Sequence, residues 1–383
     1  MKKKKLLILV NDLSFFISHR LPIAEISLTK GYNVVIGYGD YKENDEIKLL
    51  KDKGFELNFI PMHRGGINLL SNIKSFFNIW KFFKKEQPNI VHLITIKPYL
   101  YGGIISRLTG VPALVSAISG LGTLFIDKNL KGIFFRLLLY PIFKIAFNHS
   151  NQKIIVQNKD DLKVLVEWGI LKSTKAKLIK GSGTNLEDFK NFDEPKGIPT
   201  VCFAARLLRS KGVYDFIAAA KLIRERGIKA RFLLAGYLDN NNPSGLSLDD
   251  LNRLKKEANI EFLRFEKNIP TLYAKSNIIS LPSYYGEGLP KSLIEAAAAS
   301  RAIVTTDSPG CRDAIIPNKT GLLVPIKNPQ KLADAIEWLI KNPKERISMG
   351  KAGRKFAEKE FKIEKIIENH LDIYQELLSK TKI

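Results

Sequence analysis

Short apolar runs alternate with segments of helical period from one end of the chain to the other. This alternation predicts parallel β-sheets covered by helices on both faces, because parallel strands are joined by crossover helices. The strands expected in the first half are Leu6–Val10, Asn33–Gly37, Glu56–Ile60, Ile90–Ile94, Ala113–Ala117, Lys153–Val156 and Ala176–Ile179. Those expected in the second half are Thr200–Ala205, Ala230–Ala235, Ile260–Phe265, Asn277–Leu281, Ala302–Thr305 and Gly321–Val324.

A break in composition separates the two series of strands. Between Phe189 and Pro199 the chain is rich in charged residues, proline and glycine, which continue neither a strand nor a helix. We therefore expect a linker at 190–197, a first α/β domain within 1–190 and a second at 198–359. The length of 383 residues suits two doubly wound, Rossmann-like domains. Ligands of such sheets bind beyond the carboxyl ends of the strands, so two facing sheets predict a cleft.

The stretch after Leu281 contains the most informative motif. Glu287 and Glu295 lie eight positions apart and bracket Gly288, Leu289 and Pro290, which shape the entry to a helix. Pro290 is expected at the first helical position, where its missing N–H costs nothing, and the amide groups around it are expected to bind an anion such as phosphate. Either glutamate alone fits a solvated surface residue. The two together favour a binding site for a phosphate beside a sugar hydroxyl.

Two cations follow the first strand of the second domain. Arg206 and Lys211 lie where that strand ends, and positive charge at this edge can neutralise a diphosphate in the ground state and as a leaving group. Arg209, between them, is interpreted as a solvated surface residue. The glycine pairs Gly120/Gly122 and Gly181/Gly183 lack the third glycine of a dinucleotide fingerprint, and no Walker sequence occurs, which disfavours dinucleotide redox chemistry and P-loop hydrolysis.

The glutamate pair resembles the E-x7-E motif of family 4 glycosyltransferases, which are retaining enzymes with the GT-B fold. The resemblance begins near Leu6 and continues past Pro325. It implies that Glu295 binds the nucleotide ribose, that Glu287 contacts the donor sugar, and that Arg206 and Lys211 hold the diphosphate. Gly288, Leu289 and Pro290 complete the implied nucleotide site, with UDP as the expected nucleotide. In the resembled fold the final helix packs on the first domain, so 360–383 is assigned there.

Three loops of the first domain, after its first, fourth and fifth strands, resemble those of bacterial transferases that extend glycans such as O-antigen, capsule or N-glycan precursors on polyprenyl diphosphate. Many members of the family have a Phe-His-Thr-like segment after the fifth strand, where this chain has Ile118-Ser119-Gly120. The role of that histidine is therefore vacant, or passes to His92 or to backbone amides. The residues expected to contact the acceptor or the diphosphates are His19, Arg20, Lys97, Gly120 and Gly122. A single histidine at such a position is as often structural.

The net charge of +23 predicts an acidic partner. Residues 51–150 carry 13 Lys/Arg against 4 Asp/Glu. The stretch 67–88 interleaves lysines with aromatic residues, which is typical of a helix lying on an anionic membrane and equally compatible with a helix packed on the core. The expected membrane-facing residues are Lys74, Phe76, Phe77, Trp80, Lys81, Phe83 and Lys84. A second such helix is expected at 130–147, and neither stretch is apolar enough to span a bilayer.

The remaining expectations concern compartment and metal. Two cysteines, Cys202 and Cys311, favour a reducing cytosol and give no zinc-ligand spacing. The lysines at the start of the chain precede the apolar run Leu6–Val10, which is predicted as a strand and not as a signal peptide. The chain lacks the Asp-x-Asp metal signature of the other large transferase fold, so no metal and no cofactor are expected.

The sequence thus predicts a retaining glycosyltransferase at the inner face of the cell membrane. It would move a sugar, expected to be an N-acetylhexosamine, from a UDP-sugar to a polyprenyl-diphosphate-linked saccharide. Two alternatives remain open: a GT-B-fold UDP-sugar 2-epimerase, and a basic protein that binds nucleic acid.

Overall fold

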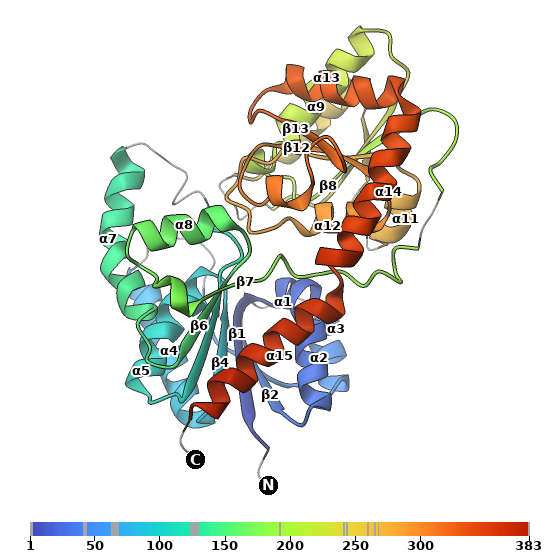
Figure 1. The fold of residues 1–383 in the computed structure, drawn as a ribbon. Coiled ribbons are helices and arrows are strands. Elements are labelled where there is room, and N and C mark those ends of the chain that lie inside the picture. The colour runs from blue at the N-terminus through green and yellow to red at the C-terminus, as the bar shows by residue number, and fades with distance from the viewer. Residues whose placement is uncertain are drawn as a thin grey trace. The chain divides into compact units, whose positions relative to one another are not determined.

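The structure is a computed structural model, and it describes residues 3–40, 44–62, 69–122, 130–190, 193–239, 242, 244–258, 260–263, 266 and 268–381. The chain divides into two compact units (Figure 1). The first unit comprises Met1–Ser182 and Glu364–Ile383, and the second comprises Gly183–Ile363.

The first unit is built on a parallel sheet in which, within the described residues, seven strands follow the order β3-β2-β1-β4-β5-β6-β7. The strands are β1 (Lys5–Asp12), β2 (Asn33–Asp40), β3 (Glu56–Phe59), β4 (Ile90–Ile94), β5 (Ala113–Ala117), β6 (Gln152–Val156) and β7 (Ala176–Leu178). All seven expected strands are present, with ends that differ by a few residues. Strands β4 and β5 are buried along their whole length, as expected for strands covered on both faces.

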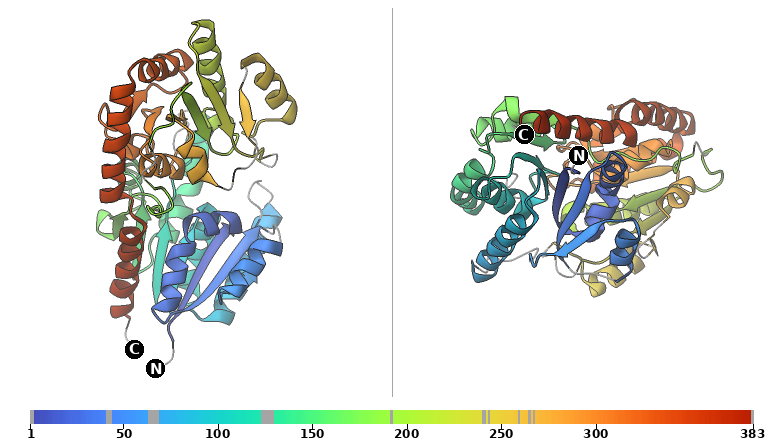
Figure 2. Two further views of the ribbon diagram at one scale, coloured as in Figure 1. Left: turned by 90° about the vertical axis from the view of Figure 1, so that its right-hand side faces the viewer. Right: turned by 90° about the horizontal axis from the view of Figure 1, so that it is seen from below.

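Helices cover both faces of this sheet. The helices on one side pack against Leu6, Ile8 and Val10 of β1, and they are α1 (Leu13–His19), α2 (Leu21–Thr29), α3 (Asn44–Asp52) and α15 (Ile363–Ser379). Those on the other side are α4 (Leu69–Glu86), the π-helix η1 (Pro98–Gly102), α5 (Gly103–Leu108), α7 (Leu130–Ala146) and α8 (Lys159–Glu167). A short 3-10 helix, η2 (Ser173–Lys175), precedes β7. Figure 2 shows α15, in dark red, lying against the strands of this unit, which agrees with the expected assignment of the final helix.

The second unit repeats the architecture with a sheet whose described strands follow the order β10-β9-β8-β11-β12-β13, again parallel. The strands are β8 (Thr200–Ala204), β9 (Arg231–Ala235), β10 (Glu261–Leu263), β11 (Ile278–Leu281), β12 (Ala302–Thr306) and β13 (Gly321–Val324). The helices are η3 (Arg209–Lys211), α9 (Val213–Glu225), α10 (Leu248–Ala258), α11 (Ile269–Ala274), α12 (Lys291–Ala298), η4 (Arg312–Ala314), α13 (Pro329–Lys341) and α14 (Pro343–Glu360). Order β9-β8-β11 places the ends of β8 and β11 side by side.

The boundary between the units differs from the expected linker. It falls between Ser182 and Gly183, whereas the composition break lies at 190–197. The physical reason is packing: Leu186 and Phe189 are buried in the core of the second unit. Arg354 of α14 also donates hydrogen bonds from Nη1 to the carbonyls of Leu186, at 3.3 Å, and Phe189. Chain that precedes the break is therefore part of the second unit.

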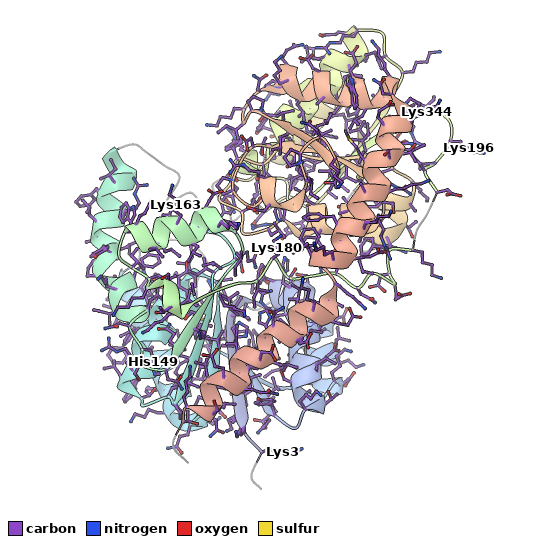
Figure 3. The ribbon with its side chains drawn as sticks, in the orientation of Figure 1. Lys3, His149, Lys163, Lys180, Lys196 and Lys344 are labelled. Atoms are coloured by element: carbon purple, nitrogen blue, oxygen red, sulfur yellow. The ribbon has the colours of Figure 1, made fainter. Side chains whose placement is uncertain are left out.

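Positive charge is spread over both units. Lys3 and Lys163 belong to the first unit, Lys196 and Lys344 belong to the second, and all four side chains are exposed (Figure 3). Among the described residues, no helix combines the length and the apolar character that crossing a bilayer requires.

Candidate functional site

The loop between β11 and α12 carries the glutamate motif. Pro290 is the N-cap of α12 and not its first helical residue, because its ψ of 123° is extended and the helix begins at Lys291. Its carbonyl accepts from the backbone N–H groups of Leu293, at 3.1 Å, and Ile294, at 3.2 Å. The expected position of Pro290 was therefore wrong by one residue. The helix start still lies directly after the glycine-rich loop, where first-turn amides favour negative charge.

Hydroxyl groups fix the loop that contains Glu287. Ser283 Oγ lies 2.8 Å from Glu287 Oε1, to which it donates, and 3.2 Å from the carbonyl oxygen of Ser210. The carbonyl of Ser283 in turn accepts from Ser308 Oγ at 3.1 Å and from Thr306 Oγ1. The carboxylate of Glu287 is thus held by a buried network, and its loop is tied to the ends of two strands.

Glycines allow two backbone segments to approach this loop closely. Gly212, which follows Lys211, has φ of +79°, and a Cβ there would lie 2.0 Å from the carbonyl oxygen of Pro282. Gly310 has φ of +77°, and its Cβ would lie 2.3 Å from the carbonyl oxygen of Gly288. Both positions therefore require glycine for conformation and for space.

Lys211 and Glu287 form an ion pair in which both side chains are largely buried. The ammonium group of Lys211 also lies 5.7 Å from the centre of the Tyr285 ring. Sequence reasoning expected this lysine and this glutamate in one site, and the structure brings them into direct contact. The pair joins the end of β8 to the loop after β11 across neighbouring strands.

Arg206 pairs with an acidic residue that sequence reasoning missed. Its Nη1 donates to Asp239 Oδ2 at 3.2 Å, and the arginine side chain is 36% exposed while that of Asp239 is 12% exposed. Asp239 follows the end of β9, next to β8 in the sheet. A carboxylate just beyond a predicted strand end was the available signal, because carboxyl ends of parallel strands share one edge.

Glu295 lies on α12, one turn after Lys291. The distance from Lys291 Nζ to Glu295 Oε1 is 3.7 Å, and the glutamate side chain is 14% exposed. Burial raises the pKa of Glu295 from 4.5 to about 7, Lys291 opposes this rise, and Asp188 adds to it. A buried carboxylate with a single lysine beside it has hydrogen-bonding capacity that a ligand hydroxyl can use.

In the first unit, the structure corrects the roles expected for His92 and Arg20. His92 is completely buried in β4, with its Nδ1 2.7 Å from Tyr374 Oη of α15, and burial lowers its pKa well below 6.5. Arg20 is also buried; its Nη1 donates to the His19 carbonyl at 2.9 Å, and burial lowers its pKa to about 10. Both side chains are core groups under α15, placed by packing and not for contact with a substrate.

Of the other predicted residues of the first unit, His19 is the last residue of α1, Lys97 follows β4, and Gly120 and Gly122 follow β5. His19 is half-buried, stacked on Phe15 with ring centres 4.1 Å apart, and its Nδ1 is 2.6 Å from Ser18 Oγ. Lys97 is half-buried, donates to Asn72 Oδ1 at 3.0 Å, and has a pKa lowered by burial. Gly120 and Gly122 have φ of +106° and +64°. These four remain predicted acceptor contacts.

A strained residue next to Lys97 was not identified from the sequence. Thr95 follows β4 with φ of +72°, a conformation that β-branched residues rarely adopt. Its carbonyl accepts from the N–H of Tyr99 at 3.1 Å, and the π-helix η1 follows. Strained residues and π-helices often occur at functional sites, so this turn supports the prediction that the loop carrying Lys97 is part of a functional site.

The helix α4 divides its predicted membrane residues between core and surface. Phe83 is buried in the core, and Phe76 is half-buried against Tyr101 with ring centres 6.0 Å apart. The prediction that these two residues face a membrane was therefore wrong. Phe77 and Trp80 are 54% and 37% exposed. Lys74, Lys81 and Lys84 of the same helix are exposed, as is Lys85. The amphipathic pattern thus serves the core on one side and leaves a basic, aromatic surface on the other.

Comparison with known proteins gives consistent matches along the chain. The model of glycosyl transferases group 1 matches residues 185–356, and the glycosyl transferase 4-like model matches residues 5–158. The chain is 29% identical over 323 residues to the N,N'-diacetylbacillosaminyl-diphospho-undecaprenol alpha-1,3-N-acetylgalactosaminyltransferase of Campylobacter jejuni, covering 81% of this chain and 83% of that protein. It is 26% identical over 361 residues to the capsular polysaccharide biosynthesis glycosyltransferase CapM of Staphylococcus aureus, covering 89% and 92%.

A solved structure extends the comparison to the fold. HepE of Anabaena, in complex with UDP and glucose, superimposes with a TM-score of 0.77 at 15% identity, covering 97% of this chain and 99% of that chain. This likeness along nearly the whole length, with two parallel-sheet units, confirms the expected GT-B fold class.

Proposed function

Because the chain belongs to the glycosyl transferase family whose group 1 and 4-like models cover residues 185–356 and 5–158, we propose that it is a retaining transferase of UDP-linked sugars. The donated sugar is an N-acetylhexosamine, and the acceptor is a saccharide on polyprenyl diphosphate. The observation that carries the proposal is the Lys211–Glu287 pair beside the start of α12, the helix that also carries Glu295.

Each donor-site residue has a distinct task in this proposal. The diphosphate lies at the start of α12 and is neutralised by Arg206 and Lys211, which also stabilise the charge that develops on the leaving group. Glu295 accepts a hydrogen bond from a ribose hydroxyl, and Glu287 accepts one from the donor sugar. Since cations and amides neutralise the leaving group, the transfer needs no metal ion.

The anomeric configuration is retained if the acceptor hydroxyl attacks the donor sugar from the same face as the one from which the diphosphate leaves. The departing phosphate then takes the proton of that hydroxyl, and no protein base is needed. In the first unit, His19, Lys97 and the Gly120–Gly122 turn contact the acceptor diphosphate. The relative from Campylobacter jejuni supports this acceptor class, since its name specifies an undecaprenol-diphosphate-linked sugar, and HepE supports UDP as the nucleotide.

The acceptor class also implies a membrane surface, so we place the protein at the inner face of the cell membrane, bound through the exposed side of α4. Lipid binding through Phe77 and Trp80 is measurable by co-sedimentation with vesicles of phosphatidylethanolamine and phosphatidylglycerol. Replacing both by serine should weaken binding on the order of tenfold, because each loses apolar area that the bilayer would bury. Trp338→Ser is the control, since this tryptophan of the second unit is similarly exposed. Equal losses in both variants would contradict the proposal.

The function itself is tested by calorimetric binding of UDP and by transfer assays. Glu295→Ala should weaken UDP binding about tenfold or more, the range for a hydrogen bond to a charged group. Glu225→Ala is the matched control, because Glu225 pairs with Lys221 one turn earlier on α9, at 4.0 Å, away from the site. Equal UDP affinity in both variants would refute the assignment of Glu295.

The transfer assay separates the alternatives. UDP-N-acetylhexosamines are incubated with and without undecaprenyl-diphosphate-linked saccharide, and products are identified by mass spectrometry and NMR. Sugar transfer that depends on the acceptor supports the proposal, and an α-linked product from an α-linked donor supports retention. Conversion of a UDP-sugar without acceptor would instead show an epimerase. Nucleic-acid binding that Glu295→Ala leaves unchanged, without UDP binding, would show a basic nucleic-acid-binding protein.

A further inference from the structure

Both cations of the proposed donor site already have a carboxylate partner within the second unit. Lys211 pairs with Glu287, and Arg206 pairs with Asp239 at 3.2 Å. The four charges cancel before any ligand binds. A diphosphate brings further negative charge, so favourable binding requires at least one cation to exchange its carboxylate for phosphate oxygens. The burial and hydrogen bonds of each pair indicate which cation can exchange its carboxylate for phosphate oxygens.

The Lys211–Glu287 pair is held firmly. Both side chains are largely buried, and Glu287 also accepts from Ser283 Oγ at 2.8 Å. The carbonyl of Ser283 is bound by Thr306 and Ser308, and Gly310 packs against the backbone of the loop. Separating this pair would leave a buried carboxylate without its cation, which is costly.

The Arg206–Asp239 pair is held more loosely on the arginine side. Arg206 contacts Asp239 through one hydrogen bond from Nη1, and the arginine side chain is 36% exposed. A guanidinium group presents five donors, so it can turn toward a phosphate while remaining near a carboxylate. An ion pair in which one side chain is partly exposed contributes less to stability than a fully buried one, so exchange at Arg206 costs less than exchange at Lys211.

Described backbone segments pack closely against Asp239 and the residues before it. A Cβ at Gly236 would lie 2.0 Å from the carbonyl oxygen of Ala205, and the N–H of Leu207 donates to the Tyr237 carbonyl at 3.1 Å. A Cβ at Gly245 would lie 2.4 Å from the carbonyl oxygen of Asp239 itself. Residues 236–239 therefore pack closely on the segment that carries Arg206, which favours movement of the arginine side chain over movement of Asp239.

We propose that Asp239 is a positioning residue: it holds Arg206 beside the donor site before binding and competes with the diphosphate for that arginine. This rests on the proposed function, in which Arg206 binds the donor diphosphate. The consequence is a site that is ordered when empty but does not hold nucleoside diphosphates as tightly as its cations would allow. A competing carboxylate also favours release of the product UDP.

The test is calorimetric titration of the full-length protein with UDP, comparing wild type with Asp239→Asn. Asparagine keeps the shape and removes the charge. UDP is expected to bind about two- to fivefold more tightly, the effect of releasing one partly exposed ion pair, and to dissociate more slowly. The gain should shrink at high salt, because it is electrostatic, while uridine affinity stays unchanged. A merely structural role would give neither the salt dependence nor the difference between UDP and uridine.

The matched control is Asp334→Asn. Asp334 accepts from Arg226 at 2.9 Å in the same unit, between α9 and α13 and outside the donor site, so its removal should leave UDP affinity unchanged. Thermal unfolding verifies that each variant is folded. Unchanged or weaker UDP binding by folded Asp239→Asn overturns the role of Asp239, even though wild type binds UDP. Failure of wild type to bind UDP would instead overturn the proposed function, and this inference with it.

Discussion

Replacing Glu295 by glutamine is expected to stabilise the ligand-free second unit, and to do so more at high pH than at low pH. The pKa of Glu295 is raised from 4.5 to about 7, chiefly by burial. Because the folded-state pKa lies above the unfolded value, the folded protein binds more protons between these two values. Its stability therefore falls as pH rises through this window.

The magnitude follows from the shift. One pKa unit corresponds to about 1.4 kcal/mol, so a carboxylate that is ionised at pH 8 lowers the free energy of unfolding by about 3 kcal/mol. At pH 5 the same linkage leaves only about 1 kcal/mol of this cost, because the folded protein keeps the proton. The stability gained by Glu295→Gln should therefore grow by about 2 kcal/mol between pH 5 and pH 8.

The assay is urea unfolding of the full-length protein followed by tryptophan fluorescence. Trp338 lies on α13 of the second unit, so replacing Trp80 and Trp168 by phenylalanine leaves one reporter for that unit. Glu225→Gln is the control, because its carboxylate is exposed beside Lys221 on α9. A gain that is the same at pH 5 and pH 8, or a loss of stability at pH 8, would refute the reasoning.

Glu295 is expected to make UDP affinity rise with pH, whereas it makes the stability of the ligand-free protein fall with pH. A ribose hydroxyl donates to the ionised form of Glu295, so UDP should bind more weakly as pH falls below about 7. The part of this decline that comes from Glu295 should be absent in Glu295→Gln, while the part that comes from protonation of the UDP phosphate at about pH 6 should remain.

Three further predictions concern positions that the structure explains. Gly212→Ala should lower the free energy of unfolding by more than the about 1–2 kcal/mol that a left-handed alanine costs, because the added Cβ meets the Pro282 carbonyl. Gly227→Ala is the control: Gly227 has φ of +71° with nothing within 4 Å, so this variant should lose only the about 1–2 kcal/mol in urea unfolding. Equal losses in the two variants would contradict the steric argument. Cys202 and Cys311 are buried, with pKa values raised to about 12 and 11, so a thiol reagent should label them only after unfolding; rapid labelling of the native protein would contradict this burial. His92→Ala should lower stability by about 2 kcal/mol or more by thermal or urea unfolding, yet leave UDP affinity unchanged in calorimetry; loss of UDP binding by folded protein would reopen a role at the site.

Much of the architecture could be predicted from the sequence because its causes are local. Strands buried on both faces must be continuously apolar, and parallel strands need helices between them, so the alternation of runs along the chain predicted both sheets. The Glu287–Glu295 motif was predictable for a similar reason. Its glycines, proline and carboxylates lie within one strand–loop–helix segment, and their spacing along the chain determines their spacing in the structure.

Tertiary structure alone decided which residues meet. The same histidine at a strand end can face a ligand or the core, and α15, from the far end of the chain, covers His92 through Tyr374. The aromatic residues of α4 follow one helical pattern, and only the packing of the helix in the core of the first unit determined that Phe83 is buried while Trp80 is exposed. The position of Asp239 beyond a strand end was a signal in the sequence, but its contact with Arg206 depends on the order of strands in the sheet, which brings together chain segments that are distant in sequence.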